Sequence, residues 1–339
     1  MTRPGPAVWG YVVRRSWHGF LRHRGFDAAA ALSFFAALTI FPVALAVVSA
    51  VALTDDRTRT VDDILSVLGS VVQESTVDAL REPLRELLTI GNPGWALTLG
   101  ILLALWSVSG YATAFGRAMN AVYEVQEGRR IWKFRGLMLI VAVVVLVAFS
   151  AMAIIVFVTP ALAQALAEQW GAGGPGWVTV WDIGKWPLLL VLAVLLVTIL
   201  YWATPNVRLP RKRWASYGAF IAIGVWAVAT TGFALYVVTV SGYERVYGWL
   251  GGGIVLLVWL FITNLALVAG AEVDAETVRV LQLVGGAESE TRVQIELRDT
   301  TRNLWLARQR SDDEAEGRRI RLEAEARRHE RAKHLDERG

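Results

Sequence analysis

Apolar residues occur along this chain in long blocks, not at the spacing of a half-buried helix or strand. Six blocks are nearly free of charge, and each is about as long as the roughly 20 residues that an α-helix needs to cross a bilayer. The expected spans are about 28–53, 94–123, 136–166, 183–204, 215–240 and 249–272. The sequence therefore predicts an all-α polytopic membrane protein with six transmembrane helices.

The segments that join these blocks differ in their number of basic residues. Leader 1–27 carries five arginines, and the segments after the second and fourth blocks carry four Lys or Arg each. The segment after the third block has no Lys or Arg, and the segment after the fifth block has one. The long segment after the first block has four arginines but also eight acidic residues. Because Lys and Arg near span ends are retained in the cytoplasm, this alternation predicts that both termini are cytoplasmic.

Two segments outside the blocks have the periodicity of amphipathic helices. Within leader 1–27, Val8–Leu21 predicts a short interfacial helix that lies on the membrane surface. Between the first two spans, apolar residues recur at helical spacing over about 60–90. We expect two short helices there that cap the external face of the bundle, either as a simple cover or as a gating lid.

The segment 273–339 is charged throughout, with fourteen basic and fifteen acidic residues. Ser311 and Glu314 have the spacing of a capping box, which predicts that a last helix begins there. That helix has almost no apolar face. We therefore expect a charged cytoplasmic tail that is partly helical or disordered.

Composition and motifs argue against several classes of enzyme. The chain has no cysteine, which excludes disulfides, thiolate zinc sites and cysteine nucleophiles. Its four histidines, His18, His23, His329 and His334, all lie outside the apolar blocks. Phosphate-binding, zinc-protease and serine-hydrolase motifs are absent from the sequence. We expect no enzymatic activity, no metal and no cofactor, and no nucleic-acid partner, since membrane orientation already accounts for the basic loops.

A polar stripe enters the second apolar block. Its members are Thr113, Arg117, Asn120 and Glu124, whose spacing places them on one side of a helix. Arg117 has two interpretations. It either snorkels to the membrane interface and pairs with an acid, or it belongs to a polar lining that a substrate or a phosphate group contacts.

Three further polar residues stand within or at the ends of later blocks. Asn264 is expected to bond a neighbouring helix. Glu272 ends the sixth block, where a carboxylate opposes the helix dipole, so it needs a cationic partner, for which Arg117 is the prediction. Lys185, near the outer end of the fourth block, is expected to snorkel. The candidate substrate-path residues are therefore Arg117, Asn120, Glu124, Asn264, Glu272 and Lys185.

Four stretches in order along the chain resemble one family of membrane proteins. They read DAAAALSFFAALTIFPVALAVVSAV, GYATAFGRAMNAVYEV, ATPNVRLPRKRWASYGA and SGYERVYGWLGGGIVLLVWLFITNLALVAGAEVDAE. Over about residues 10–280 the chain is similar to the YihY/BrkB family. The resemblance implies a six-helix protein of the bacterial inner membrane. Members have been called virulence factors, have carried a ribonuclease label and have been suspected of lipid transport, and the family supplies no catalytic residues to carry over.

Two functions fit these features. The first is a transporter or translocator of a lipid, an anionic lipid included, or of another amphipathic solute, through a polar-lined cavity between the helices that opens to the cytoplasm. The second is a non-transporting scaffold that organises an envelope complex through its tail. Membrane lipids are expected partners in either case, and a homo-oligomer is left open.

Overall fold

The structure is a computed structural model that describes residues 6–53, 92–158, 168, 176–208, 216–239 and 249–336. In these ranges it has eight helices: α1 (Pro6–Arg22), α2 (Gly25–Val51), α5 (Pro93–Val122), α6 (Ile131–Phe157), α8 (Trp177–Ala203), α9 (Tyr217–Thr239), α11 (Trp249–Val284) and α12 (Thr301–Asp336). Six of them, α2, α5, α6, α8, α9 and α11, are long and apolar enough to cross a membrane. The all-α class and the number of candidate spans are thus confirmed, whereas the expected cap at 60–90 lies outside the described residues.

The largest differences from the predicted boundaries are near the C-terminus. The sixth span does not end at Glu272 but continues as α11 to Val284. Its polar continuation is stable as a helix because its side chains pack and pair with other elements, as shown below. The last helix starts at Thr301 and not at Ser311, because Asp299 Oδ1 accepts hydrogen bonds from the amide and the hydroxyl of Thr301.

The spans associate in two close pairs. Helix α2 packs along α5, where Gly100 approaches the backbone of Ala46, and α9 packs along α11, where Gly218 approaches the backbone of Gly270. Helix α11 also packs against α2, which joins the two pairs, while α6 packs on α5 and α8 contacts α6 and α9 more sparsely. Small residues at these contacts let helix backbones approach closely, which is how helices commonly associate in membranes.

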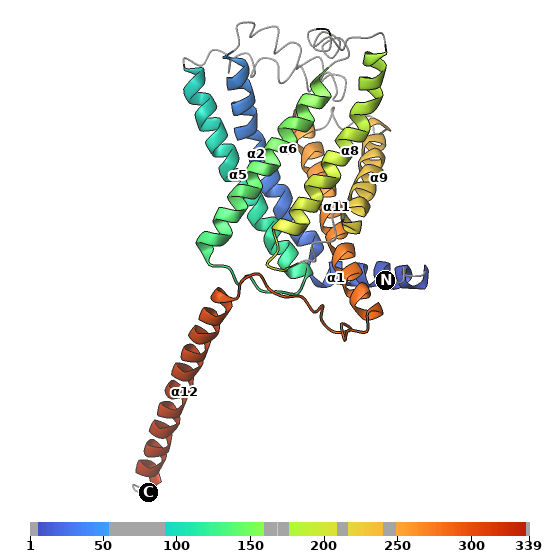
Figure 1. The fold of residues 1–339 in the computed structure, drawn as a ribbon. Helices are drawn as coiled ribbons and strands as arrows, with labels where there is room; N and C mark the ends of the chain where they lie inside the picture. The colour runs from blue at the N-terminus through green and yellow to red at the C-terminus, as the bar shows by residue number, and fades with distance from the viewer. Residues whose placement is uncertain are drawn as a thin grey trace.

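For α6, α8 and α9, burial is confined to one end of the bundle, where the spans converge and α1 lies across their axis (Figure 1). Helices α2 and α5 differ, because residues such as Val48 and Ala96 are buried toward the other end as well. The buried residues of α8 lie between Leu196 and Ala203, and those of α9 between Gly218 and Ala222. We call this end the packed end. Toward the other end no residue of 146–156, 177–195 or 224–239 is buried, and we call these three segments the open half.

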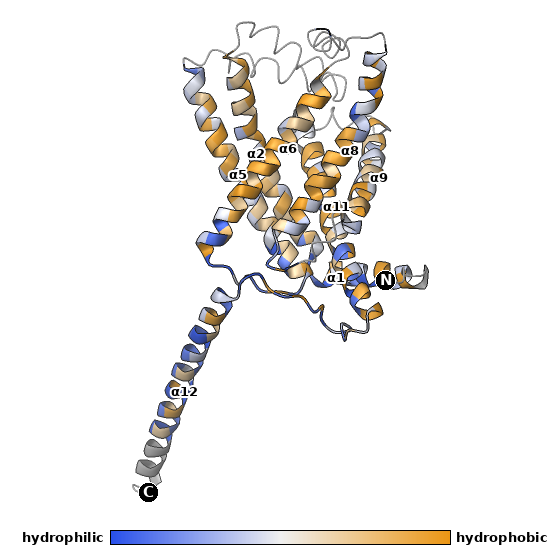
Figure 2. Cartoon of the chain, viewed as in Figure 1, coloured by the Kyte–Doolittle hydropathy of each residue, from blue (hydrophilic) through white to orange (hydrophobic). Residues whose placement is uncertain are grey.

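Helix α12 projects away from the packed end as a single rod (Figure 1). Its side chains over 301–328 are exposed apart from half-buried Asn303. Polar residues predominate along it, in contrast to the apolar spans (Figure 2). Ion pairs one turn apart, such as Arg321 with Glu325, stabilise such a helix without tertiary packing.

Candidate functional site

The packed end is held together by a buried carboxylate on α11. Glu272 is 1% exposed, and its Oε1 lies 2.8 Å from Nδ1 of His23, which follows α1. Its other oxygen, Oε2, is buried without a hydrogen-bond partner and faces Gly19, where a Cβ would approach it to 2.7 Å. A side chain at position 19 would require the Glu272 carboxylate to shift from this position.

Charged side chains from three elements surround this contact. Nε2 of His23 lies 3.5 Å from Oε1 of Glu124, and Nη1 of Arg22 lies at the same distance from that oxygen. Glu124 follows the end of α5 with a φ of 53° and is thereby turned toward α1 and α11. Nη2 of Arg279 on α11 lies 3.9 Å from Glu124, which makes this carboxylate a junction of α1, α5 and α11.

A second pair lies one turn further along α11. Oε2 of Glu276 is 3.0 Å from Nε of Arg15 on α1 and 3.0 Å from Nε of Arg279. Arg279 also donates from Nη1 to the carbonyl of Ser289. Because Glu276 and Arg279 are buried, these bonds are needed to offset the cost of removing their charges from water.

The surroundings of His23 favour its charged form. Its hydrogen bond to Glu272 raises the pKa of His23, burial lowers it, and the charges of Glu272 and Glu124 raise it further, with a net rise above 6.5. His23 therefore keeps its proton up to a higher pH than a free histidine does. Since His23 bonds α1 to Glu272 on α11, its positive charge strengthens this contact.

A third buried acid on α11, Asp274, bonds to the start of α9 and the end of α5. Oδ1 of Asp274 accepts a 2.6 Å hydrogen bond from the hydroxyl of Ser216, and Oδ2 accepts one from the hydroxyl of Tyr123 at 3.3 Å. Gly218, two residues after Ser216, packs against Asp274 and Gly270. Asp274 thus ties the start of α9 and the end of α5 to α11.

Asn120 joins the second span to two loops. Its Nδ2 donates to Oε2 of Glu127 at 2.8 Å, and its Oδ1 accepts from the amide of Asn206 at 2.8 Å. Glu127 in turn binds the guanidinium of Arg129, whose Nη2 also donates to the carbonyl of Thr204. These bonds fix the α5–α6 loop against the end of α8.

The segment 285–300 between α11 and α12 is fastened to the same loops, and we call it the strap. The side chain of Asn206 donates to the carbonyl of Asp299 and accepts from its amide, while Leu297 forms an isolated antiparallel bridge with Val207. Arg298 donates to the carbonyl of Trp202 at the end of α8 and to that of Val207 in the loop that follows. Helix α12 is therefore tied to the packed end through the strap.

Two charged residues of the strap, Asp299 and Arg298, have shifted pKa values. Hydrogen bonds from Thr301, aided by Lys133, lower the pKa of Asp299 to about 2, so that its carboxyl group is ionised. Burial lowers the pKa of Arg298. Gly128 lies so close to the carbonyl of Asp299 that a Cβ there would stand 1.9 Å from it. Glycine is the residue that permits the α5–α6 loop and the strap to meet here.

Asn264 is buried halfway along the bundle at the edge of the open half. Its Oδ1 accepts from the hydroxyl of Tyr111 at 2.8 Å, and its Nδ2 donates to the hydroxyl of Ser33 at 3.3 Å. The neighbouring Thr263 accepts a hydrogen bond from the indole of Trp226. The expectation that Asn264 bonds neighbouring helices is confirmed, and the bonds join α2 and α5 to α11.

The predicted contact between Arg117 and Glu272 is wrong. Glu272 pairs with His23 instead, and Arg117 is exposed while Thr113 and Asn120 are buried. The four residues of the stripe therefore do not share one environment, since α5 ends before Glu124 and the chain turns there. Asn120 and Glu272 are enclosed by protein groups, and a contact of either with a substrate stays a prediction.

Lys185 lies far from this cluster, in the open half on α8. Its Nζ is 2.5 Å from Oδ1 of Asp182 and lies 5.8 Å from the ring centroid of Trp186. The lysine is thus paired on its own helix beside an aromatic residue, as is common at a membrane interface. It contributes nothing to the packed end.

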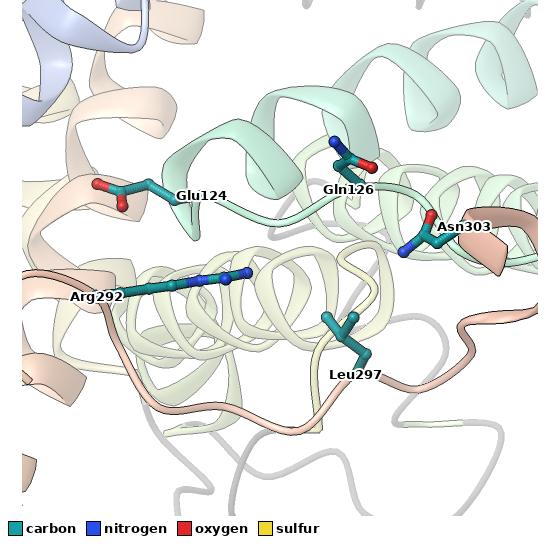
Figure 3. A pocket seen from close by; sticks show the side chains of 5 residues that line it. All are labelled: Glu124, Gln126, Arg292, Leu297 and Asn303. Carbon is teal, nitrogen blue, oxygen red and sulfur yellow. The ribbon is translucent and has the colours of Figure 1, made fainter. Parts of the chain in front are cut away.

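An open pocket of about 500 Å³ lies between the α5–α6 loop and the strap (Figure 3). Glu124 and Gln126 line it from the loop, Arg292 and Leu297 from the strap, and Asn303 from the first turn of α12. It lies outside the spans and is not the predicted cavity between the helices. Among the described residues no group of three or more His, Asp or Glu is placed to hold a metal ion.

Sequence reasoning missed several residues of the packed end. These are Arg15, His23, Asp274, Arg279, Asn206 and Arg129, with Glu127. One signal was present: Glu272, Glu276 and Arg279 follow each other at helical spacing, which indicates that the sixth helix continues. The partners on α1 had no such signal, because they are about 250 positions away in the chain.

A comparison with known proteins places this arrangement in a family. A family model described as virulence factor BrkB matches residues 16–292. The chain belongs to the BrkB family. It is accordingly a multi-pass integral membrane protein, and the match covers the His23–Glu272 contact of the packed end but neither Arg15 nor α12.

Individual relatives are distant. The chain is 28% identical over 258 residues to a putative ribonuclease-like protein, YfkH, of Bacillus subtilis, with 75% of this chain and 90% of that protein covered. It is 27% identical over 275 residues to a UPF0761 membrane protein of Alkalilimnicola ehrlichii, with 77% of this chain but only 56% of that protein covered. A UPF0761 membrane protein of Aliivibrio salmonicida is 25% identical over 283 residues, with 78% and 84% covered. No solved structure is significantly similar.

Proposed function

We propose that this BrkB-family protein translocates a lipid or another amphipathic solute, an anionic lipid included, across the bacterial inner membrane. The observation that carries the proposal is the uneven burial of the spans. The packed end is closed by ion pairs and hydrogen bonds, whereas no residue of the open half is buried. Three spans, α6, α8 and α9, that are packed at one end and loose at the other, beside a closely packed α2–α5 pair, are suited to one state of an alternating-access cycle.

The open half has the chemistry that an acyl chain requires. Residues 177–195 of α8 are exposed or half-buried around the whole circumference of the helix, so their apolar side chains are uncovered on the bundle side as well as on the lipid side. Exposed apolar residues there include Val180, Ile183 and Val191. Together with 224–239 of α9 they offer an apolar surface between helices on which a lipid tail can lie.

A layer of polar side chains lies between the open half and the packed end, and we call it the floor of the open half. Tyr111, Ser33 and Asn264 are bonded to one another where the buried core begins. Polar groups at this depth are expensive to keep in a membrane and commonly belong to a substrate path. A polar headgroup descending between the helices would meet this layer first, and passage beyond it requires the packed end to open.

We place the packed end in the cytoplasm, with both termini on that side. Basic residues gather there, among them Arg14, Arg24, Arg130, Lys133 and Arg135. Cytoplasmic retention of Lys and Arg supports this orientation. The open half then faces the periplasm, in place of the cavity open to the cytoplasm that the sequence alone suggested.

The proposal includes no enzymatic step, no cofactor and no nucleic-acid partner. The name of the Bacillus subtilis relative mentions a ribonuclease-like protein, and a nuclease would require groups that activate water or stabilise a phosphorane. The buried acids of the packed end are instead bound to arginine, histidine, serine and tyrosine groups within the protein.

Reconstitution tests the proposal. The purified full chain is placed in liposomes that contain a fluorescent, headgroup-labelled phosphatidylglycerol, and a membrane-impermeant reductant bleaches the label in the outer leaflet. We expect the protein to increase the rate at which inner-leaflet label becomes accessible, measured without a proton gradient and with gradients of both directions. Rates equal to those of protein-free liposomes under all three conditions would contradict translocation of this lipid class.

A second candidate function is a scaffold, and α12 favours it. The helix has 36 residues and therefore extends about 54 Å at 1.5 Å per residue. It is solvated, carries blocks of alternating charge and is joined to the packed end by the strap. Removal of residues 301–339 separates the two functions: a scaffold loses its partner and its cellular role, whereas a translocator retains lipid movement in liposomes.

A further inference from the structure

Helix α1 has three distinct sectors around its axis. On a helical wheel with about 100° between successive residues, Val12 is placed at 0°. The residues that pack on the bundle then lie within about 80° of Val12 in either direction. They are Val12, Ser16, Gly19, Phe20 and His23, which are buried or half-buried. This sector is explained by the contact with α11 and requires no further partner.

The next sector is apolar and uncovered. Val13, Trp17 and Leu21 fall at about 100°, 140° and 180° on the same wheel. They are 65%, 57% and 48% exposed. Three large apolar side chains in line along a helix, one of them a tryptophan, are costly to leave in water.

The third sector is basic. Arg14, His18 and Arg22 follow at about 200°, 240° and 280°. All three are exposed, although Arg22 also pairs with Glu124. Residues 1–26 contain no Asp or Glu, so the positive charge of this sector is not neutralised by acids of the same segment.

The apolar sector is continuous with a surface that already lies in lipid. The ring of Trp17 stacks on Phe20, and the ring of Phe20 meets Phe26 edge-to-face at 5.1 Å between centroids. Phe26 is 47% exposed at the beginning of α2, a candidate span. Helix α1 also lies across the axis of the spans, the orientation of a helix parallel to a membrane surface (Figure 1).

We propose that α1 docks on an anionic lipid surface, with Val13, Trp17 and Leu21 inserted at the boundary of the acyl chains and Arg14 and His18 against the headgroup phosphates. Apolar and basic sectors side by side are the features that bind an interfacial helix to anionic lipid. The opposite side of the same helix carries Gly19 and His23 against Glu272. The docked membrane surface therefore supports the contact that closes the packed end. This inference does not depend on translocation.

The absence of cysteine from the chain allows a direct test in the full-length protein. Single variants Val13→Cys and Trp17→Cys are labelled with a fluorophore and reconstituted in vesicles of phosphatidylcholine with or without phosphatidylglycerol. The matched control is Leu322→Cys on solvated α12, where the native side chain is also 57% exposed. Quenching is measured with neutral acrylamide in the water and with a nitroxide attached near the lipid headgroup.

In vesicles with phosphatidylglycerol, we expect the labels on α1 to lose several-fold in acrylamide quenching relative to position 322 and to be quenched by the lipid nitroxide. Adding Arg14→Gln to the Trp17→Cys variant should shift docking about fivefold toward the undocked state in these vesicles, and have no effect in phosphatidylcholine alone. Labels as open to acrylamide as position 322 would overturn the proposal. So would labels shielded from acrylamide but not quenched by the lipid nitroxide, since protein, such as a second copy, would then cover the sector.

Discussion

Gly218 of α9 rests directly on Gly270 of α11: a Cβ at Gly218 would lie 2.2 Å from the carbonyl oxygen of Gly270. The obstruction is backbone, which cannot rotate away. Gly270 is equally confined, because a Cβ there would come within 2.7 Å of the carbonyl oxygen of Gly218 and of the hydroxyl of Tyr201. The closest contact between these two spans therefore needs glycine on both sides.

Gly218→Ala should separate α9 from α11 and destabilise the bundle. Overpacking by one methyl group in a tight contact typically costs about 1–3 kcal/mol. Gly224→Ala on the same helix is the matched control, since nothing lies within 4 Å of a Cβ at that position. The melting temperature in detergent, followed by tryptophan fluorescence, should fall for Gly218→Ala and be unchanged or slightly raised for Gly224→Ala. Equal values for the two variants would show that the helices are not in contact there.

The contact between His23 and Glu272 should make the stability of the packed end depend on pH. The pKa of His23 is raised in the folded protein, chiefly by its hydrogen bond to Glu272. A raised histidine pKa contributes stability that is complete below the unfolded value of about 6.5 and is lost as pH rises through the folded value. The melting temperature should accordingly decline as pH rises above about 6.5.

Glu272→Gln should remove most of this dependence, because the neutral amide no longer stabilises the imidazolium. It should also lower stability by about 1–3 kcal/mol at pH 6, the usual cost of weakening a buried charge-assisted hydrogen bond. Glu316→Gln breaks a pair of similar length with Arg319 on exposed α12 and serves as the control, with an effect of about 1 kcal/mol or less. A Glu272→Gln protein with the pH profile of the native chain would rule out this role for the pair.

The spans could be predicted from sequence because each is a local property. Apolar length alone located most ends of the spans to within a few residues, and the basic leader indicated α1. The third span is instead α6, Ile131–Phe157 and not 136–166, and the fourth begins at Trp177 and not at 183. The largest exception, at Glu272, has a physical cause: the helix continues to Val284 because Asp274, Glu276 and Arg279 bond to partners that no local pattern reveals. Long-range pairing decides such boundaries.

The candidate site was harder to predict for the same reason. The sequence predicts Arg117 as the partner of Glu272 because a carboxylate at a helix end needs a cation and Arg117 is expected at the same membrane level. The chain turns at Glu124, where φ is positive, and His23 takes the place expected for Arg117. Asn264 was predicted correctly because an asparagine in a span has few alternatives to bonding another helix.

Asn206 should decide whether the strap stays attached. Its side chain has three hydrogen bonds to the backbone of Gln126 and Asp299, and it is fully buried. Asn206→Ala leaves those groups without partners, at a cost of about 1–3 kcal/mol. Hydrogen exchange at residues 292–300 should become faster. Asn303→Ala is the control, since Oδ1 of Asn303 has no partner among the described residues, and unchanged exchange in Asn206→Ala would show that other contacts suffice.

Asn264→Leu separates a role in translocation from a role in stability. The substitution removes the hydrogen bonds to Tyr111 and Ser33 and makes the floor of the open half apolar. Hydrogen bonds between membrane helices contribute only about 0.6 kcal/mol on average, so the melting temperature should change little. If a headgroup must pass this layer, the transfer rate of labelled phosphatidylglycerol in liposomes should fall about tenfold or more, because an unsolvated polar group costs at least about 1.4 kcal/mol.

Trp226→Phe removes the neighbouring bond to Thr263 and should leave the rate near that of the native chain. Full transfer by a correctly folded Asn264→Leu protein would mean that the lipid does not cross at this layer.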